Sequence, residues 1–385
     1  MAFIKYLVPA LAVASLSVAQ NCDGKITIEN QSDASGLSSC QKIDGDVIID
    51  LKVENAISLD GVQEITGSLD ATGAVNMTSL AAGQLTTIGD SFTLLNNARL
   101  TNLQFDNLEE VGEVNFEGCP VLQQLNFAKE ISKASKVRIT NTYLTTLQGI
   151  NLETVGNFEI TNNPKLKEVD VDQITNITGT AIFSANHKDL RISFPNLESV
   201  RNISVRNAST VQFPSLKSTE GLFGLYSNYI EDFLAGNLTQ TGDLVFADNS
   251  ALTNLSLPVL ETVKGAFQVA NNSMLKSIDA APKLKTVSGA LDFSGSFSKV
   301  DLPSLESVDG GVNLQTSSEF DCGSFNQDVA GGDFTCKPKA ANPTTKDGSS
   351  GTGSGSAATT SDFGTNIAPP AGLSMFALML GAFAL

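Results

Sequence analysis

The chain of 385 residues contains no tryptophan, only one histidine and few basic residues. Lys and Arg total 24 against 41 Asp and Glu, so the formal net charge is -17 at pH 7. This balance argues against nucleic acid as a partner, because phosphates require a basic binding face. The single histidine, His187, stands between Asn186 and Lys188, and we expect a solvated turn residue there rather than a general base.

Local motifs of the common enzyme classes are also missing from the sequence. It contains no GxSxG, no HExxH and no phosphate-binding glycine loop. It has no CxxC pair that would suggest a zinc site. We therefore expect no catalytic residue, no metal site and no cofactor.

The N-terminus has the features of a secretory signal peptide over residues 1–19. Lys5 provides the positive start, Leu7–Val18 form the apolar core, and Ser17–Ala19 form a small-x-small cleavage site before Gln20. The alternative is a transmembrane helix, but the apolar run is short and ends in small residues. The sequence thus predicts a secreted protein.

The C-terminus has the pattern of a glycosylphosphatidylinositol (GPI) attachment signal. Lys346–Asp362 is a linker rich in Ser, Gly, Thr and Ala, and Ala371–Leu385 is an apolar tail that runs to the last residue. The tail is shorter than the ~20 residues that span a bilayer, which argues against a tail-anchored helix. Small residues, a spacer and an apolar tail favour a lipid anchor at Ser356, with Gly355 or Ala358 as alternatives.

Two processing signals place the chain in the secretory pathway, where thiols oxidise. The five cysteines stand at positions 22, 40, 119, 322 and 336. We predict disulfides Cys22–Cys40 and Cys322–Cys336, each closing a short loop and contributing about 3 kcal/mol. Cys119 is left over, and we expect it to be a buried thiol.

A repeat of about 22 residues organises the middle of the chain. The string Leu257–Asp279 recurs in similar form at Asn151–Val171 and Leu302–Leu314. Each copy has an anchor residue that is β-branched, and these anchors are Ile43, Ile65, Ile88, Val111, Val155, Ile177, Val200, Thr219, Thr241, Val263, Val287 and Val308. The coil at 127–147 is degenerate and keeps only the later strand and corner.

The pattern within each repeat predicts short strands. A glycine follows most anchors and permits a tight bend, and alternating residues such as Phe267 and Val269 then place one face in a core. Coils of this length are too short to hold a strand and a full helix. They predict an all-β parallel solenoid of about twelve coils, some 60 Å long at ~4.8 Å per coil. Tyr226–Leu234 is the one stretch where a short helical insertion is conceivable.

Asparagine recurs at one corner of the repeat, and asparagine tolerates turn conformations that other residues avoid. We expect these residues to stack into a ladder: Asn97, Asn141, Asn163, Asn186, Asn207, Asn228, Asn249 and Asn272. Eight N-x-Ser/Thr sequons predict N-glycosylation at Asn30, Asn76, Asn176, Asn202, Asn207, Asn237, Asn254 and Asn271. Asn207 and Asn271 lie at the corner, where the ladder and a glycan compete for the side chain.

Parallel β-helices often carry polysaccharide hydrolases, which need two or three converging carboxylates. One acidic residue recurs at a fixed repeat position, as Glu153, Glu198, Glu261 and Glu306. A catalytic site would be local and not repeated, so we interpret these residues as a solvated edge of the solenoid.

The repeat L-x-x-(V/I)-x-G, followed by N-N-x-x-L, resembles the receptor L-domain, a right-handed β-helix related to leucine-rich repeats. Combined with the signal peptide, the two terminal cysteine pairs and the anchor signal, it resembles the fungal cell-wall organisation family. Members of that family are GPI-anchored glycoproteins related to sporulation-specific wall proteins. The resemblance covers Cys22 to the tail, and it implies a role in wall assembly and integrity without catalytic residues.

These observations predict the following layout: signal peptide 1–19, disulfide-closed caps 20–41 and 317–340, repeats 42–316, linker and anchor site 341–358, and propeptide 359–385. The expected protein is a non-enzymatic surface glycoprotein held on the outer leaflet of the plasma membrane, in contact with wall glucan or mannoprotein. Two alternatives remain open. One is a wall-polysaccharide hydrolase or transglycosylase, and the other is a ligand-binding module with exposed aromatics such as Tyr143, Tyr226 and Tyr229.

Overall fold

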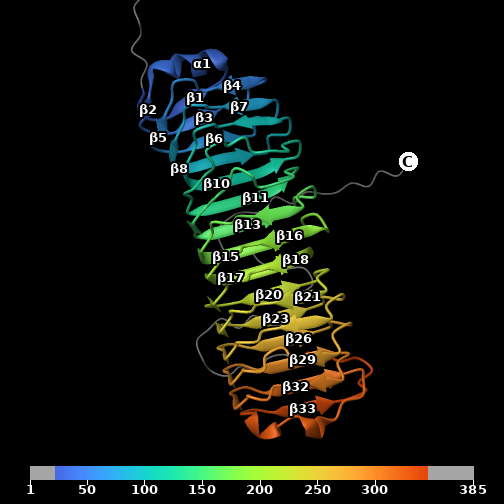
Figure 1. The fold of residues 1–385 in the computed structure, drawn as a ribbon. Helices are drawn as coiled ribbons and strands as arrows, with labels where there is room; N and C mark the ends of the chain where they lie inside the picture. Colours follow the sequence, from blue (N-terminus) through green and yellow to red (C-terminus); the bar gives the residue numbers. More distant parts are fainter. Residues whose placement is uncertain (1–21, 346–385) are drawn as a thin grey trace, which may run out of the picture. The chain divides into compact units, whose positions relative to one another are not determined.

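The structure is a computed structural model that describes residues 22–345. Its strands stack in chain order from β1 at one end to β33 at the other (Figure 1). The pairings that join successive coils are parallel, and 23 of the strands form one continuous sheet. The predicted all-β parallel solenoid is therefore confirmed. Within 22–345, no helix has the length and apolar character needed to cross a membrane.

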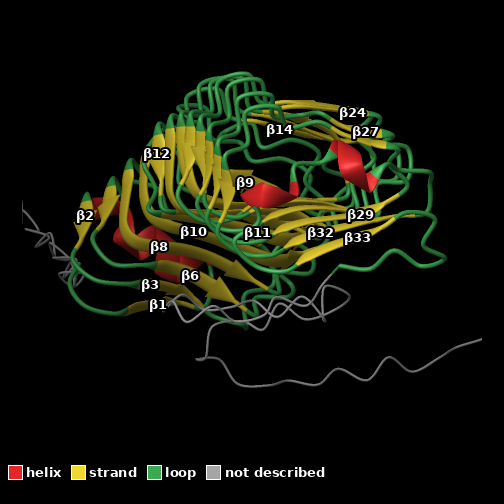
Figure 2. Ribbon diagram, turned by 90° about the horizontal axis from the view of Figure 1, so that it is seen from below, coloured by secondary structure: helices red, strands yellow, loops and turns green. Residues whose placement is uncertain are grey.

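A coil contains up to three short strands, which we call a, b and c in chain order. Figure 2 views the solenoid from one end, with the strands on different sides of a shared interior. The a strands that stand alone are β2 (Lys42–Ile43), β5 (Glu64–Ile65), β12 (Thr154–Val155), β19 (Ser218–Thr219), β22 (Gln240–Thr241), β25 (Thr262–Val263), β28 (Thr286–Val287) and β31 (Ser307–Val308).

The b strands form the broad part of the large sheet, and four of them run on from the a position without a break. These continuous strands are β8 (Thr87–Leu95), β10 (Glu110–Cys119), β15 (Asn176–Ser184) and β17 (Ser199–Arg206). The other b strands are β1 (Ile26–Ile28), β3 (Val47–Ile49), β6 (Leu69–Thr72), β11 (Lys136–Thr142), β13 (Asn157–Thr161), β20 (Phe223–Tyr226), β23 (Leu244–Ala247), β26 (Phe267–Ala270), β29 (Leu291–Gly295), β32 (Val312–Thr316) and β33 (Phe334–Lys337).

The c strands form four small sheets on the remaining side. They are β4 (Ala56–Ser58), β7 (Ser79–Ala81) and β9 (Asn102–Gln104), then β14 (Glu168–Asp170), β16 (Leu190–Ser193) and β18 (Ala208–Gln212), then β21 (Asp232–Leu234) with β24 (Asn254–Ser256), and β27 (Ser277–Ile278) with β30 (Lys299–Val300). Helices occur near the ends of the described chain, as α1 (Gln31–Gly36) and the 3-10 turns η1 (Leu37–Ser39), η2 (Cys322–Ser324) and η3 (Gln327–Val329).

The glycine that follows most anchors allows one coil to approach the next closely. A Cβ atom at Gly89 would lie 2.1 Å from the carbonyl oxygen of Thr66 in the preceding coil, and one at Gly112 would lie 2.1 Å from that of Asp90. No side chain fits at such distances, so the position requires glycine.

Phenylalanine fills the interior as a near-continuous column. Phe92, Phe105, Phe116 and Phe127 contact one another, with ring centroids between 4.8 and 6.5 Å apart along this chain of contacts. A similar run of contacts leads from Phe158 through later coils. Burying an aromatic side chain contributes about 1.5–3 kcal/mol, so these rings supply much of the stability of each coil.

The asparagine ladder is buried at the corner between the b and c strands. The Asn249 amide donates to the carbonyl of Leu225 at 2.9 Å, while its Oδ1 accepts from the backbone of Asn228 at 3.0 Å. Asn272 makes the same kind of contact with Asn249. The backbone N–H of Asn249 donates to the Oδ1 atom of Asn272 at 2.9 Å. The buried members are Asn97, Asn163, Asn186, Asn228, Asn249 and Asn272.

The prediction that Asn141 and Asn207 belong to the ladder is wrong. Asn141 and Asn207 lie one residue earlier in their coils, at a position with φ of 54° and 65°, and the buried places behind them hold Thr142 and Ala208. Asparagine occurs at both positions because it also tolerates positive φ. Another coil holds Cys119, which is free and buried, and burial raises the pKa of its thiol to about 11.

The helical insertion considered for Tyr226–Leu234 is also wrong. β20 ends at Tyr226 and β21 occupies Asp232–Leu234, so this coil follows the common plan. The large sheet also extends past the predicted repeat limits 42–316, because β1 pairs with β3 and β33 pairs with β32.

Replacing Asn249 by alanine tests the ladder. The variant leaves the backbone N–H of Asn228 buried without its partner and removes the bond to the Leu225 carbonyl, so we expect the free energy of unfolding to fall by about 2–4 kcal/mol. Ser250→Ala, at the exposed neighbouring position, is the control and should change it by less than about 0.5 kcal/mol. Denaturant unfolding of both variants measures the difference, and equal midpoints would contradict the role of the ladder.

Candidate functional site

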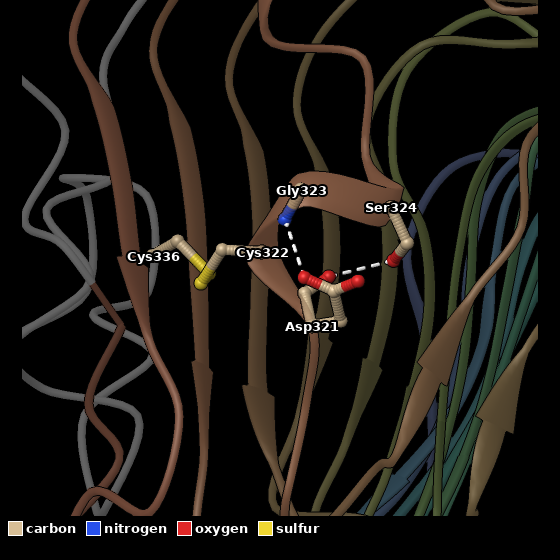
Figure 3. The surroundings of a disulfide bond; sticks show 5 residues. All are labelled: Asp321, Cys322, Gly323, Ser324 and Cys336. Atoms are coloured by element: carbon tan, nitrogen blue, oxygen red, sulfur yellow. Dashed lines mark hydrogen bonds between the residues drawn. A yellow bond between two sulfur atoms is a disulfide. The ribbon is translucent and has the colours of Figure 1, made fainter.

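Disulfides close both ends of the described chain. Cys22 is bonded to Cys40, next to α1, and Cys322 is bonded to Cys336 of β33. In Figure 3 the second bond stands beside a turn in which Asp321 accepts from the Gly323 backbone at 2.9 Å. These ends cover the last apolar layers of the solenoid, which have no further coil to pack against.

The predicted glycosylation sites differ in how far their side chains are available. Asn254 and Asn271 are exposed, and no hydrogen bond of their side chains occurs within residues 22–345. Asn202 accepts from the Leu222 backbone at 2.9 Å, and Asn176 accepts from Ser199 at 2.8 Å. Asn237 is exposed, but its amide donates to the carbonyl of Pro214 at 2.7 Å.

The competition at the Asn271 corner is resolved by the geometry. Asn271 has φ of 55° and is exposed, whereas Asn272 behind it is buried and carries the ladder contact. The predicted glycosylation site, Asn271, and the ladder residue, Asn272, are therefore two different residues. Asn207 is half-buried, and its amide donates to the carbonyl of Asn186 at 3.2 Å.

Asn30 and Asn76 complete the set. Asn30 caps α1, where its Oδ1 accepts from the Ser32 backbone at 2.9 Å, and Asn76 is half-buried in a turn. No sequon lies between Asn76 and Asn176. The coils from β8 to β14 are thus without a predicted glycan.

The anchor positions Ser356, Gly355 and Ala358, and the signal peptide 1–19, lie outside the described residues. They remain predictions from the sequence.

The four repeated glutamates lie on the surface, and two of them form ion pairs between coils. Glu198 contacts Lys217 at 2.8 Å and Glu261 contacts Lys285 at 3.0 Å, with all four side chains about half exposed. His187 accepts from the Asp189 backbone at 3.1 Å in a turn. No group of three or more metal-ligating side chains occurs in the described part of the chain.

The aromatic side chains proposed for ligand binding are only partly available. Tyr143 is 40% exposed and Tyr229 52% exposed, but Tyr226 is 3% exposed, with the Arg206 guanidinium 4.3 Å from its ring centre. The expectation of an exposed Tyr226 is wrong.

The c side of the solenoid is interrupted at the degenerate coil. Between β9 and β14 two successive coils have no c strand, and isolated bridges join Gln104 to Asn126 and Ile131 to Ile150. Glu130 has φ of 62°, and Gly149 occupies a position where neighbouring coils place Phe127 and Val171. Gly149 is buried, and a Cβ atom there would lie 3.1 Å from the Cβ of Phe127, so the two coils pack closely at this position.

Two adjoining hollows result, and we call them together the c-side groove. One has a volume of about 360 Å³ and the other about 380 Å³, and both are lined by Glu130, Thr146 and Gln148. A third hollow, of about 520 Å³, lies at the same coil on the a side, where Lys133 forms an ion pair with Glu110. The irregular coil therefore shapes the surface on two sides.

Carboxylates and amides dominate the c-side groove. Asp170 and Asp172 are hydrogen-bonded to each other, and this contact, with partial burial and the charges of Asp172 and Glu168, raises the pKa of Asp170. Glu130 accepts from Asn151 at 2.8 Å. The amides of Gln148 and Gln173 are exposed, and neither has a hydrogen-bond partner within residues 22–345.

This groove was not predicted from the sequence. Its signals were present in the degenerate coil 127–147 and in Gly149, which replaces the large apolar residue of the repeat. The residues that line it come from separate coils, so their convergence depends on the register of stacking.

Comparisons with known proteins agree with the fold. A family described as "GPI-anchored cell wall organization protein" matches residues 1–38, and a BspA-type leucine-rich repeat family matches residues 86–212 in six copies. No solved structure matches significantly.

Three curated relatives span most of the chain. "Cell surface GPI-anchored protein" of Arthroderma benhamiae is 49% identical over 91% of this chain and 92% of its own length. "Protein ecm33" of Aspergillus fumigatus is 45% identical over 91% of this chain and 90% of its own length. "Sporulation-specific protein 2" of Saccharomyces cerevisiae is 27% identical over 80% of this chain and 62% of its own length.

The pH dependence of Asp170→Asn tests the carboxylate pair. The folded state binds the Asp170 proton more tightly than the unfolded chain, so the pair lowers stability at neutral pH and stops doing so as pH falls through the raised pKa. The variant should therefore have a higher Tm than the parent at about pH 7, and an equal Tm at about pH 2, where both states are protonated.

Asp301→Asn is the matched control. Asp301 holds the same position in its repeat as Asp170, but it forms an ion pair with Lys299 at 2.8 Å. It should not raise the Tm. An increase of the same size in both variants would show that Asp170 and Asp172 do not repel each other.

Proposed function

Because this chain belongs to the family of GPI-anchored cell wall organization proteins, we propose that it acts without catalysis as a lipid-anchored surface glycoprotein. Its role is the organisation, biogenesis and integrity of the fungal cell wall. The observation that carries this proposal is the similarity to "Protein ecm33" along 91% of the chain. Its place is the cell surface, at the membrane and in the wall.

The proposed attachment to the outer leaflet is supported by the C-terminal sequence. Small residues at 355–358, a spacer and an apolar tail match the requirements of GPI transfer, with Ser356 as the attachment residue. Attachment to the outer leaflet brings the protein next to the wall, where glucan or mannoprotein are its proposed partners.

A non-enzymatic role is supported by the arrangement of the carboxylates. Glycoside hydrolases hold two carboxyl groups ~5–9.5 Å apart, on either side of the bond that is cleaved. The carboxyl groups of Asp170 and Asp172 interact closely enough that this contact is the main cause of the raised pKa of Asp170, which does not match the wider separation of a hydrolase pair. Glu198 and Glu261 are engaged in ion pairs on the surface.

Treatment of intact cells with a phospholipase specific for phosphatidylinositol tests the anchor. The membrane-bound protein should be released, since its only hold on the bilayer is the lipid. Replacing residues 355–358 by bulky residues should abolish this attachment, because transfer needs small side chains. The same replacement at 348–351, in the same linker, is the matched control and should leave the protein on the surface.

Immunoblots of medium, membrane and wall fractions report the outcome for both variants. Protein that stays on the membrane after the phospholipase, and after replacement of 355–358, would contradict the proposal.

A further inference from the structure

We propose that the c-side groove binds a neutral polysaccharide strand of the wall, through side-chain amides and carboxylates that bond the hydroxyl groups of the sugar. The inference rests on the proposed function, since the wall is what brings polysaccharide to the protein. It adds the position of the contact and the class of ligand. Nothing about the rest of the solenoid requires the groove, because the other coils pair without it.

The size and form of the groove suit a ligand. Each of its two hollows, about 360 and 380 Å³, falls within the range of small-molecule sites. The hollows are joined through Glu130, Thr146 and Gln148, which line both. A joined pair on the surface can hold several sugar units in a row, whereas a closed cavity would hold a single small molecule.

The chemistry of the lining favours a neutral, hydroxyl-rich ligand. Gln124, Gln148 and Gln173 offer exposed amides that can both donate and accept, and none of them has a hydrogen-bond partner elsewhere in residues 22–345. Asp172 and Thr145 add an acceptor and a hydroxyl group. Sugar hydroxyls match both kinds of group, because each can donate and accept.

An anionic polymer does not fit the same lining. No Lys or Arg borders either hollow, while Asp106, Glu130, Glu168, Asp170 and Asp172 do, and of these carboxylates Glu168 forms an ion pair with Arg191 at 2.7 Å. The like charges would repel sulfate, phosphate or uronate groups, and no cation in the lining offsets this. The groove therefore selects against polyanions.

The distribution of sequons leaves the groove accessible. Its lining lies between Asp106 and Gln173, inside the interval from Asn76 to Asn176 that has no sequon. Farther along the c side, glycans at Asn237 and Asn254 would cover the coils of β21 and β24. The hollowed coils are thus a part of the c side where no predicted glycan stands in front of a ligand.

A matched pair of tryptophan variants tests the groove. Thr145 lines it, and Thr253 holds the same repeat position elsewhere, and both donate to a carbonyl of the preceding coil at 3.3 and 3.1 Å. Both side chains are exposed, so tryptophan should be tolerated equally at the two sites. Only Thr145→Trp fills the groove. Gln148→Ala is a second, smaller change that removes an amide without adding bulk.

Binding is measured by calorimetry on the mature glycoprotein, extracted in detergent. The probes are soluble oligosaccharides of glucose, N-acetylglucosamine and mannose, with dextran sulfate as the polyanion. We expect saturable binding of at least one neutral oligosaccharide, a loss of about tenfold or more in affinity for Thr145→Trp, a smaller loss for Gln148→Ala, and no change for Thr253→Trp.

Three results would overturn the inference. They are the absence of binding by all neutral probes, a preference for dextran sulfate, and equal effects of Thr145→Trp and Thr253→Trp. The failure of the groove is distinguishable from the failure of the proposed function. If the phospholipase still releases the protein while no oligosaccharide binds, the anchored wall protein stands and only the groove is wrong.

Discussion

Stacking of one coil on the next is the constraint on which the rest of this structure depends. A single coil cannot bury its own apolar residues, so Phe92 needs Phe116 of the following coil, and Asn249 needs Asn228 and Asn272 on either side. Every b strand is held by parallel pairing to its neighbours, and this fixes the coil spacing. Side chains from residues distant in sequence then meet in register on the outside.

The same constraint explains why one irregular coil has consequences for the surface. The b strand β11 keeps its pairing with β10 and β13, so the stack continues through the irregularity. The c side departs from the pattern in the same two coils, which have no c strand between β9 and β14. A hollow can therefore form on the outside at little cost to the column inside.

Much of the fold could be predicted from the sequence because each repeat has the same kinds of residue at the same positions and therefore folds in the same way. Anchors such as Val263 and glycines such as Gly265 recur with one period, so a single coil indicated the whole solenoid. The corner was harder, since asparagine occupies both the left-handed position of Asn271 and the buried position of Asn272. The groove could not be predicted from the sequence, because Glu130, Gln148 and Asp170 lie in different coils and come together only through the register in which the coils stack.

Amide hydrogen exchange on the mature glycoprotein, with and without a neutral oligosaccharide, tests the central claim most directly. Without ligand, amides of the b strands from β3 to β32 should exchange slowly, and those of 127–150 outside β11 should exchange fastest within the solenoid. With ligand, exchange should slow at 124–130, 145–151 and 168–173 alone. Uniform slow exchange through 127–150, or slowing confined to the broad b side, would contradict the account.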